Sequence, residues 1–195
     1  MARATNAIAA SEDLRTHLRS ATMAAHDLLD NAMQEASGWG SRADYARFLA
    51  LQHAARAPLE DWLACHAPAD LVPPPQTPLI AADLEALGEA LPPPAPGFMR
   101  TRAATGDALG AAWVLAGSAL GNRAIAKQVA RIGGGAWPTA FLGDAAMMAF
   151  WQGLRARIEQ PVPASEADGA ADTAAAVFAH FLAVAGQGAR PGLGT

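Results

Sequence analysis

Long apolar blocks rich in alanine and leucine alternate along the chain with short stretches of proline, glycine and polar residues. Proline lacks the amide hydrogen that a helix needs and glycine lowers helix stability, so these stretches are expected to separate helices. The predicted helices cover residues 11–35, 41–65, 78–91, 98–132, 139–159 and 170–185. Ser11 and Ser41 are suited to cap the first two, because a serine hydroxyl accepts a free amide hydrogen there.

One long uncharged stretch is residues 108–122, which Asp107 and Arg123 flank. Its 15 residues fall short of the roughly 20 that a membrane-spanning helix needs. The stretch therefore predicts a buried core helix, and no membrane partner is expected.

The composition favours an all-α protein with one core. Of the 195 residues, 52% are hydrophobic and 16% are charged, and aromatic and β-branched residues, which favour strands, are few. This length suits a single domain. We expect a helical domain over residues 11–186, with flexible ends at 1–10 and 187–195.

Charge and cysteine content exclude several classes of function. The net charge is −4 and Lys127 is the only lysine, which argues against a nucleic-acid partner. Cys65 is the only cysteine, so no disulfide framework and no cysteine-based zinc site are expected. The N-terminus lacks the apolar stretch of a signal peptide, so a cytoplasmic location is expected.

Three side chains of different chemistry share one stripe of the first helix. Arg19, His26 and Asp30 are spaced by seven and four residues, which places them on the same face. Heme requires such a set: an imidazole for the iron, a carboxylate near that ligand and a cation for a propionate. A lone helical histidine is more often a surface or core residue, so spacing alone leaves both interpretations open.

Three glycines form a similar stripe in the long apolar helix. Gly110, Gly117 and Gly121 recur at spacings of seven and four, although glycine inside a helix costs up to about 1 kcal/mol relative to alanine. Either a flat ligand lies against this face or another helix packs closely on it. Ser118 and Asn122 add polar groups beside the stripe, and Ser118 could hold a water molecule.

The order and spacing of these segments resemble the heme oxygenase family, most closely the bacterial branch that supplies biliverdin to bacteriophytochromes. LRSATMAAH resembles the family's proximal helix and WVLAGSALGNRAI its distal helix, while YARFLALQHAARAPLEDWL, LIAADLEALG and FWQGLRARIE resemble three further helices. The resemblance implies an all-α, single-domain heme-oxygenase-like bundle. It implies catalytic roles for Gly117, Ser118 and Gly121, iron ligation by His26, and further heme contacts from Arg19, Thr22, Asp30, Asn122 and Arg155.

The resemblance implies the oxidative opening of heme, which is both cofactor and substrate, to biliverdin with release of CO and iron. The reaction would use O2 and electrons from a ferredoxin or a flavoprotein reductase. The sequence departs from the family at Ala116, Ser118 and Asn122, where relatives often have glutamate, aspartate and glycine. Two alternatives remain: a non-catalytic heme carrier or sensor of the same fold, and a heme-free helical domain in which the glycines serve only packing.

Overall fold

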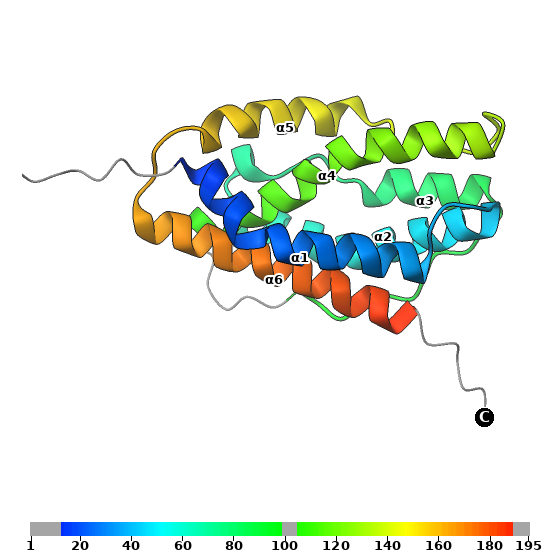
Figure 1. Cartoon of the computed structure of the whole chain (residues 1–195), viewed down its shortest axis with the longest axis horizontal. Helices are drawn as coiled ribbons and strands as arrows, with labels where there is room; N and C mark the ends of the chain where they lie inside the picture. Colours follow the sequence, from blue (N-terminus) through cyan, green and yellow to red (C-terminus); the bar gives the residue numbers. More distant parts are fainter. Residues whose placement is uncertain (1–12, 99–104, 189–195) are drawn as a thin grey trace, which may run out of the picture.

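The computed structural model describes residues 13–98 and 105–188 as a bundle of helices (Figure 1). The six α-helices of this part are α1 (Leu14–Ala36), α2 (Arg42–His66), α3 (Thr77–Ala86), α4 (Thr105–Ile132), α5 (Ala145–Ile158) and α6 (Ala164–Gly188), and a short 3-10 turn covers Ala69–Leu71. The prediction of an all-α single domain is confirmed. The predicted flexible ends fall almost entirely outside the described residues.

Side-chain caps set where the first two helices begin. Ser41 caps α2 as predicted, because its hydroxyl oxygen accepts the backbone N–H of Asp44 at 3.1 Å. The carboxylate of Asp13 caps α1 by accepting the N–H of Thr16 at 2.7 Å. The predicted cap Ser11 lies outside the described residues, and Asp13 takes that role.

The helices predicted over 78–91 and 139–159 are longer than α3 and α5 in the structure. Gly88 follows α3 with a φ of 67°, a left-handed conformation that ends the helix before the predicted residue 91. Residues 140–143 form turns, where the buried carboxylate of Asp83 accepts the N–H groups of Ala140 and Phe141 at 2.9 and 3.0 Å. Asp144 then caps α5. A contact with a residue 57 positions away fixes this start, and local sequence could not reveal it.

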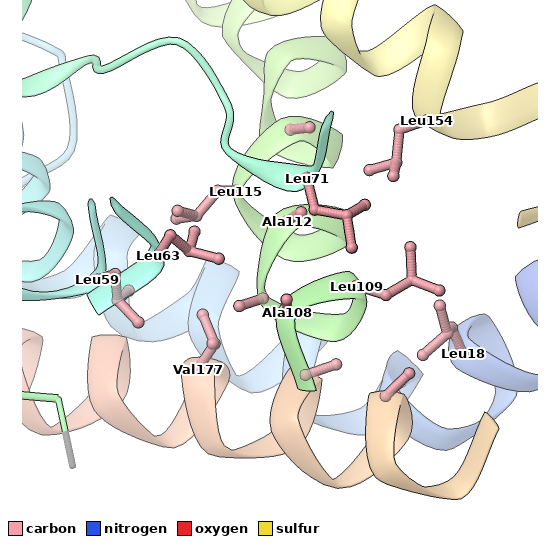
Figure 2. Close-up of a cluster of buried hydrophobic side chains, with 14 of the residues drawn as sticks. Leu18, Leu59, Leu63, Leu71, Ala108, Leu109, Ala112, Leu115, Leu154 and Val177 are labelled. Atoms are coloured by element: carbon pink, nitrogen blue, oxygen red, sulfur yellow. The ribbon is translucent and has the colours of Figure 1, made fainter. Parts of the chain in front are cut away.

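The apolar faces of α1, α2, α4, α5 and α6 meet in the larger of two core clusters (Figure 2). The labelled core side chains are Leu18, Leu59, Leu63, Leu71, Ala108, Leu109, Ala112, Leu115, Leu154 and Val177. The first half of α4 is therefore surrounded by other elements, as the uncharged stretch predicted.

The backbones of α4 and α6 touch where α4 carries glycine. A Cβ atom placed on Gly110 would lie 2.1 Å from the carbonyl oxygen of Ala170, and one on Gly106 would lie 2.5 Å from that of Glu166. Real Cβ atoms do not approach so closely, so these positions admit only glycine without a backbone shift. Gly110 thus serves helix packing, which was one of the two interpretations of the glycine stripe.

Helix α6 is long and apolar enough to cross a membrane by length and composition, over Ala164–Gln187 with a mean hydropathy of 1.3. In the structure it runs beside α1 and packs on α4 (Figure 1). Of its most apolar stretch, 44% is buried by these neighbours. We therefore interpret α6 as a core helix.

Candidate functional site

A cavity of about 860 Å³ lies between α1 and the middle of α4, with further walls from α2, α5 and α6. Its lining is mainly apolar, with Trp113, Trp151 and Phe178 among the aromatic side chains. The size falls within the range of about 300–1,000 Å³ that is usual for sites of small molecules and cofactors. Most of the residues that the sequence singled out contribute to this lining.

His26 and Asp30 both line the cavity from α1. His26 Nδ1 lies 3.3 Å from Asp30 Oδ2, and the His26 side chain is 59% exposed. Its ring meets Phe178 of α6 at a steep angle, with centroids 6.0 Å apart. A carboxylate beside Nδ1 favours the tautomer that carries its proton there, which leaves the lone pair of Nε2 to bind a metal.

Arg19 and Thr22 line the same cavity from the preceding turns of α1. Arg19 is exposed, whereas Thr22 is buried and its hydroxyl donates to the carbonyl of Leu18 at 2.7 Å. Sequence reasoning missed Arg15, which also lines the cavity one helical turn before Arg19. The spacing of four between the two arginines was the sequence feature that could have identified it.

The glycines of α4 have different surroundings from one end of the stripe to the other. A Cβ atom on Gly117 would make ordinary contact with Trp151 Cζ3 at 3.6 Å. A Cβ atom on Gly121 would meet nothing within 4 Å. Gly117 and Gly121 line the cavity, while Gly110 packs on α6, so the two interpretations of the stripe apply to different segments of the helix.

Ser118 and Asn122 are polar residues of α4 that line the cavity. The Ser118 hydroxyl donates to the carbonyl of Leu115 at 2.8 Å. Asn122 is 7% exposed and lines both this cavity and a second one of about 480 Å³. Ala116 is fully buried in the core cluster, so its side chain does not face the cavity.

Arg56 of α2 is a cavity residue that the sequence analysis missed. It is 1% exposed, and its Nη2 donates to Ser118 Oγ at 2.7 Å while its Nε donates to Gln52 Oε1 at 3.1 Å. All three side chains line the cavity. No local signal identifies Arg56, because its burial depends on α4 and on the Phe141 ring, whose centroid lies 5.1 Å from the guanidinium carbon.

Arg155 is the predicted heme contact that the structure does not bring to the cavity wall. Its Nε donates to Glu159 Oε1 at 2.8 Å, and the side chain is 52% exposed. The same carboxylate oxygen lies 3.6 Å from Nη1 of Arg15. Glu159 thus joins Arg155 to a cavity residue, and Arg15 occupies the position nearer the cavity.

No protein-family model matches the chain, and no curated protein matches its sequence. Among solved structures, the chain is similar to the NO- and CO-bound heme oxygenase from Neisseria meningitidis, with a TM-score of 0.63 and 18% identity. The match covers 91% of this chain and 92% of that one. At this identity the similarity shows the fold and assigns no residue roles. The chain therefore has an all-α, single-domain fold of the heme oxygenase type.

Proposed function

We propose that this protein is a heme oxygenase, which opens heme to biliverdin and releases CO and iron, using O2 and electrons from a ferredoxin or flavoprotein reductase. One observation carries the proposal. Within this fold, a histidine paired with a carboxylate and a helix face left bare by glycine line the same cavity. The proposed location is the cytoplasm, and the proposed use of the product is to supply a bacteriophytochrome.

The residues present fit heme. The apolar walls suit the porphyrin, and the pairing of His26 with Asp30 prepares Nε2 to bind iron. Arg15 and Arg19 supply positive charge for the two propionates. Gly121 leaves space beside α4 that any other residue would fill.

Bound heme supplies the iron and the oxidative chemistry, and the protein supplies position and surroundings. His26, oriented by Asp30, would hold the iron. Gly117 and Gly121 would leave the adjoining part of the cavity free of side chains. The Ser118 hydroxyl donates its hydrogen bond to the carbonyl of Leu115. Its oxygen is therefore an acceptor in this arrangement, and the hydrogen bond that it accepts comes from Arg56.

A hemin titration followed by absorption spectroscopy tests the binding half of the proposal. The wild type is expected to take one equivalent and to show the spectrum of a histidine-ligated heme. His26→Ala should lose that spectrum, because it removes the ligand. His17→Ala is the matched control: His17 lies on the same helix, pairs with Asp168 at 3.6 Å and lies outside the cavity lining.

Adding ascorbate or a ferredoxin system under air tests turnover. Decay of the heme bands with formation of biliverdin would support the enzyme. A stable heme complex would contradict the oxygenase and identify the carrier or sensor of the same fold. If neither the wild type nor His17→Ala bound hemin, both heme functions would be wrong.

A further inference from the structure

The second cavity lies on another face of α4, outside the proposed heme site. It has a volume of about 480 Å³ and lies between α4, α5 and the turns that precede α5. Asn122 is the residue that it shares with the first cavity. The size is in the range that is usual for small ligands. A ligand there would leave the space beside His26 free.

Arg123 and Lys127 give the open side of this cavity a positive charge. They are one helical turn apart on α4, and both are exposed and line the cavity. Neither makes an ion pair or a side-chain hydrogen bond with a residue that the structure describes. Like charges at this spacing repel each other, so an anion that pairs with both would be stabilising. Acidic partners are present for other arginines, namely Arg15, Arg42, Arg47, Arg155 and Arg157.

The dipole of α4 accounts for a third cation but not for these two. Arg131 is in the last turn of α4, where the helix dipole favours positive charge, and it is not part of the cavity lining. This effect falls off within the last turn, and Arg123 and Lys127 precede that turn. Their charges therefore need another explanation.

Asp144 is the acid in the cavity lining, and its charge is already used elsewhere. Its carboxylate accepts the backbone N–H groups of Ala146 and Met147 at 3.0 and 2.9 Å and the Gln76 side-chain amide at 2.8 Å. It is thus directed at the start of α5. The lining residues carry one more positive charge than negative, which fits a monoanion.

The inner wall is apolar and carries one free amide. The apolar side chains are buried, among them Ala119, Phe141, Leu142 and Met147. Asn122 is 7% exposed, and its side chain has no hydrogen-bond partner among the described residues. Its polar atoms are nevertheless not sealed in protein, unlike Nη1 of Arg56. Asn122 and Lys127 are five residues apart, so they lie on opposite sides of the α4 face that borders the cavity.

We propose that the second cavity binds a small organic monoanion, a carboxylate with an apolar body and a hydroxyl group at its far end. The carboxylate pairs with Arg123 and Lys127 at the open side. The body lies on the apolar inner wall, and Asn122 hydrogen-bonds to the hydroxyl group. The inference does not involve heme, so its success or failure is independent of the proposed function.

Methionine methyl resonances show which cavity a probe enters. Met147 and Met148 line the second cavity, whereas Met23 and Met33 line the first. In the full chain without hemin, labelled with carbon-13 in the methionine methyl groups, 4-hydroxybenzoate should shift the Met147 and Met148 resonances saturably. The Met23 and Met33 resonances should not move. Shifts at Met23 and Met33 alone, or saturable shifts at none of the four, would overturn the site.

The same titration on charge variants tests the two cations. Arg123→Gln and Lys127→Gln should each weaken 4-hydroxybenzoate binding about threefold, and the double variant about tenfold, because exposed ion pairs are individually weak. Arg131→Gln is the matched control, since it removes one positive charge from the same helix outside the cavity lining. Equal affinity in the double variant and the wild type would overturn the proposal, as would an equal loss in Arg131→Gln.

Benzoate, which lacks the hydroxyl group, tests the role of Asn122. The wild type should bind 4-hydroxybenzoate about threefold more tightly than benzoate, the effect of one hydrogen bond. Asn122→Leu keeps the approximate size of the side chain and should bind the two probes equally. An unchanged preference for 4-hydroxybenzoate in this variant would contradict the assigned role of Asn122.

Discussion

The same substitution at two glycines of α4 is expected to have opposite effects on stability. Gly110→Ala would place Cβ 2.1 Å from the carbonyl oxygen of Ala170, so α4 and α6 would have to separate. Overpacking of this kind costs about 1–3 kcal/mol. At Gly121 the added methyl meets nothing within 4 Å, so alanine gains about 0.5–1 kcal/mol from helix propensity alone.

Urea unfolding followed by far-UV circular dichroism measures both changes, and thermal unfolding gives a second readout. For a chain of this length, 1 kcal/mol corresponds to about 2–4 °C in melting temperature. We therefore expect Gly110→Ala to melt about 2–12 °C lower than the wild type and Gly121→Ala about 1–4 °C higher. Equal shifts at the two positions would refute the division of the glycine stripe into a packing half and a cavity half.

Three further predictions concern the cavity, pH and capping. Gly121→Leu should abolish biliverdin formation while hemin still binds; a normal biliverdin yield would contradict the role of that space. Burial lowers the pKa of His180 despite the hydrogen bond to Ala55, so the free energy of unfolding should fall as pH drops below 6.5, and His180→Gln should flatten that slope in urea titrations. Asp144→Ala should cost about 1–2 kcal/mol at pH 7. Burial raises the pKa of Asp144 but the bonds from Gln76 and backbone amides lower it overall, so this cost should shrink as pH falls below 3.8.

Much of the fold followed from local sequence because helices depend on local rules. The apolar blocks and their proline and glycine borders identified the helices, and Ser41 was recognised as a cap from its position alone. The start of α5 was predicted wrongly because Asp83, on a different helix, binds the turn before it. Boundaries set by such distant contacts have no signature in a single segment.

For the candidate site as well, the residues set by local spacing were predicted and those set by distant contacts were missed. His26 and Asp30 were predicted together because both lie on one helix, where spacing determines proximity. Arg56 was missed because its partner Ser118 is 62 residues away, and an arginine in a helix is usually solvated. Gly110 and Gly121 appeared equivalent in sequence, and only the course of α6 distinguishes them.

The close contact between α4 and α6 implies that the backbone amides of α4 exchange hydrogen at different rates. Amides of residues 108–112 lie in the part that other helices enclose, so their exchange should require unfolding of the whole domain. Amides of residues 113–121 lie along the cavity and should exchange through local opening. We therefore expect α4 to be anchored over its first turns and to bend more easily where it borders the cavity, next to the residues proposed to face heme.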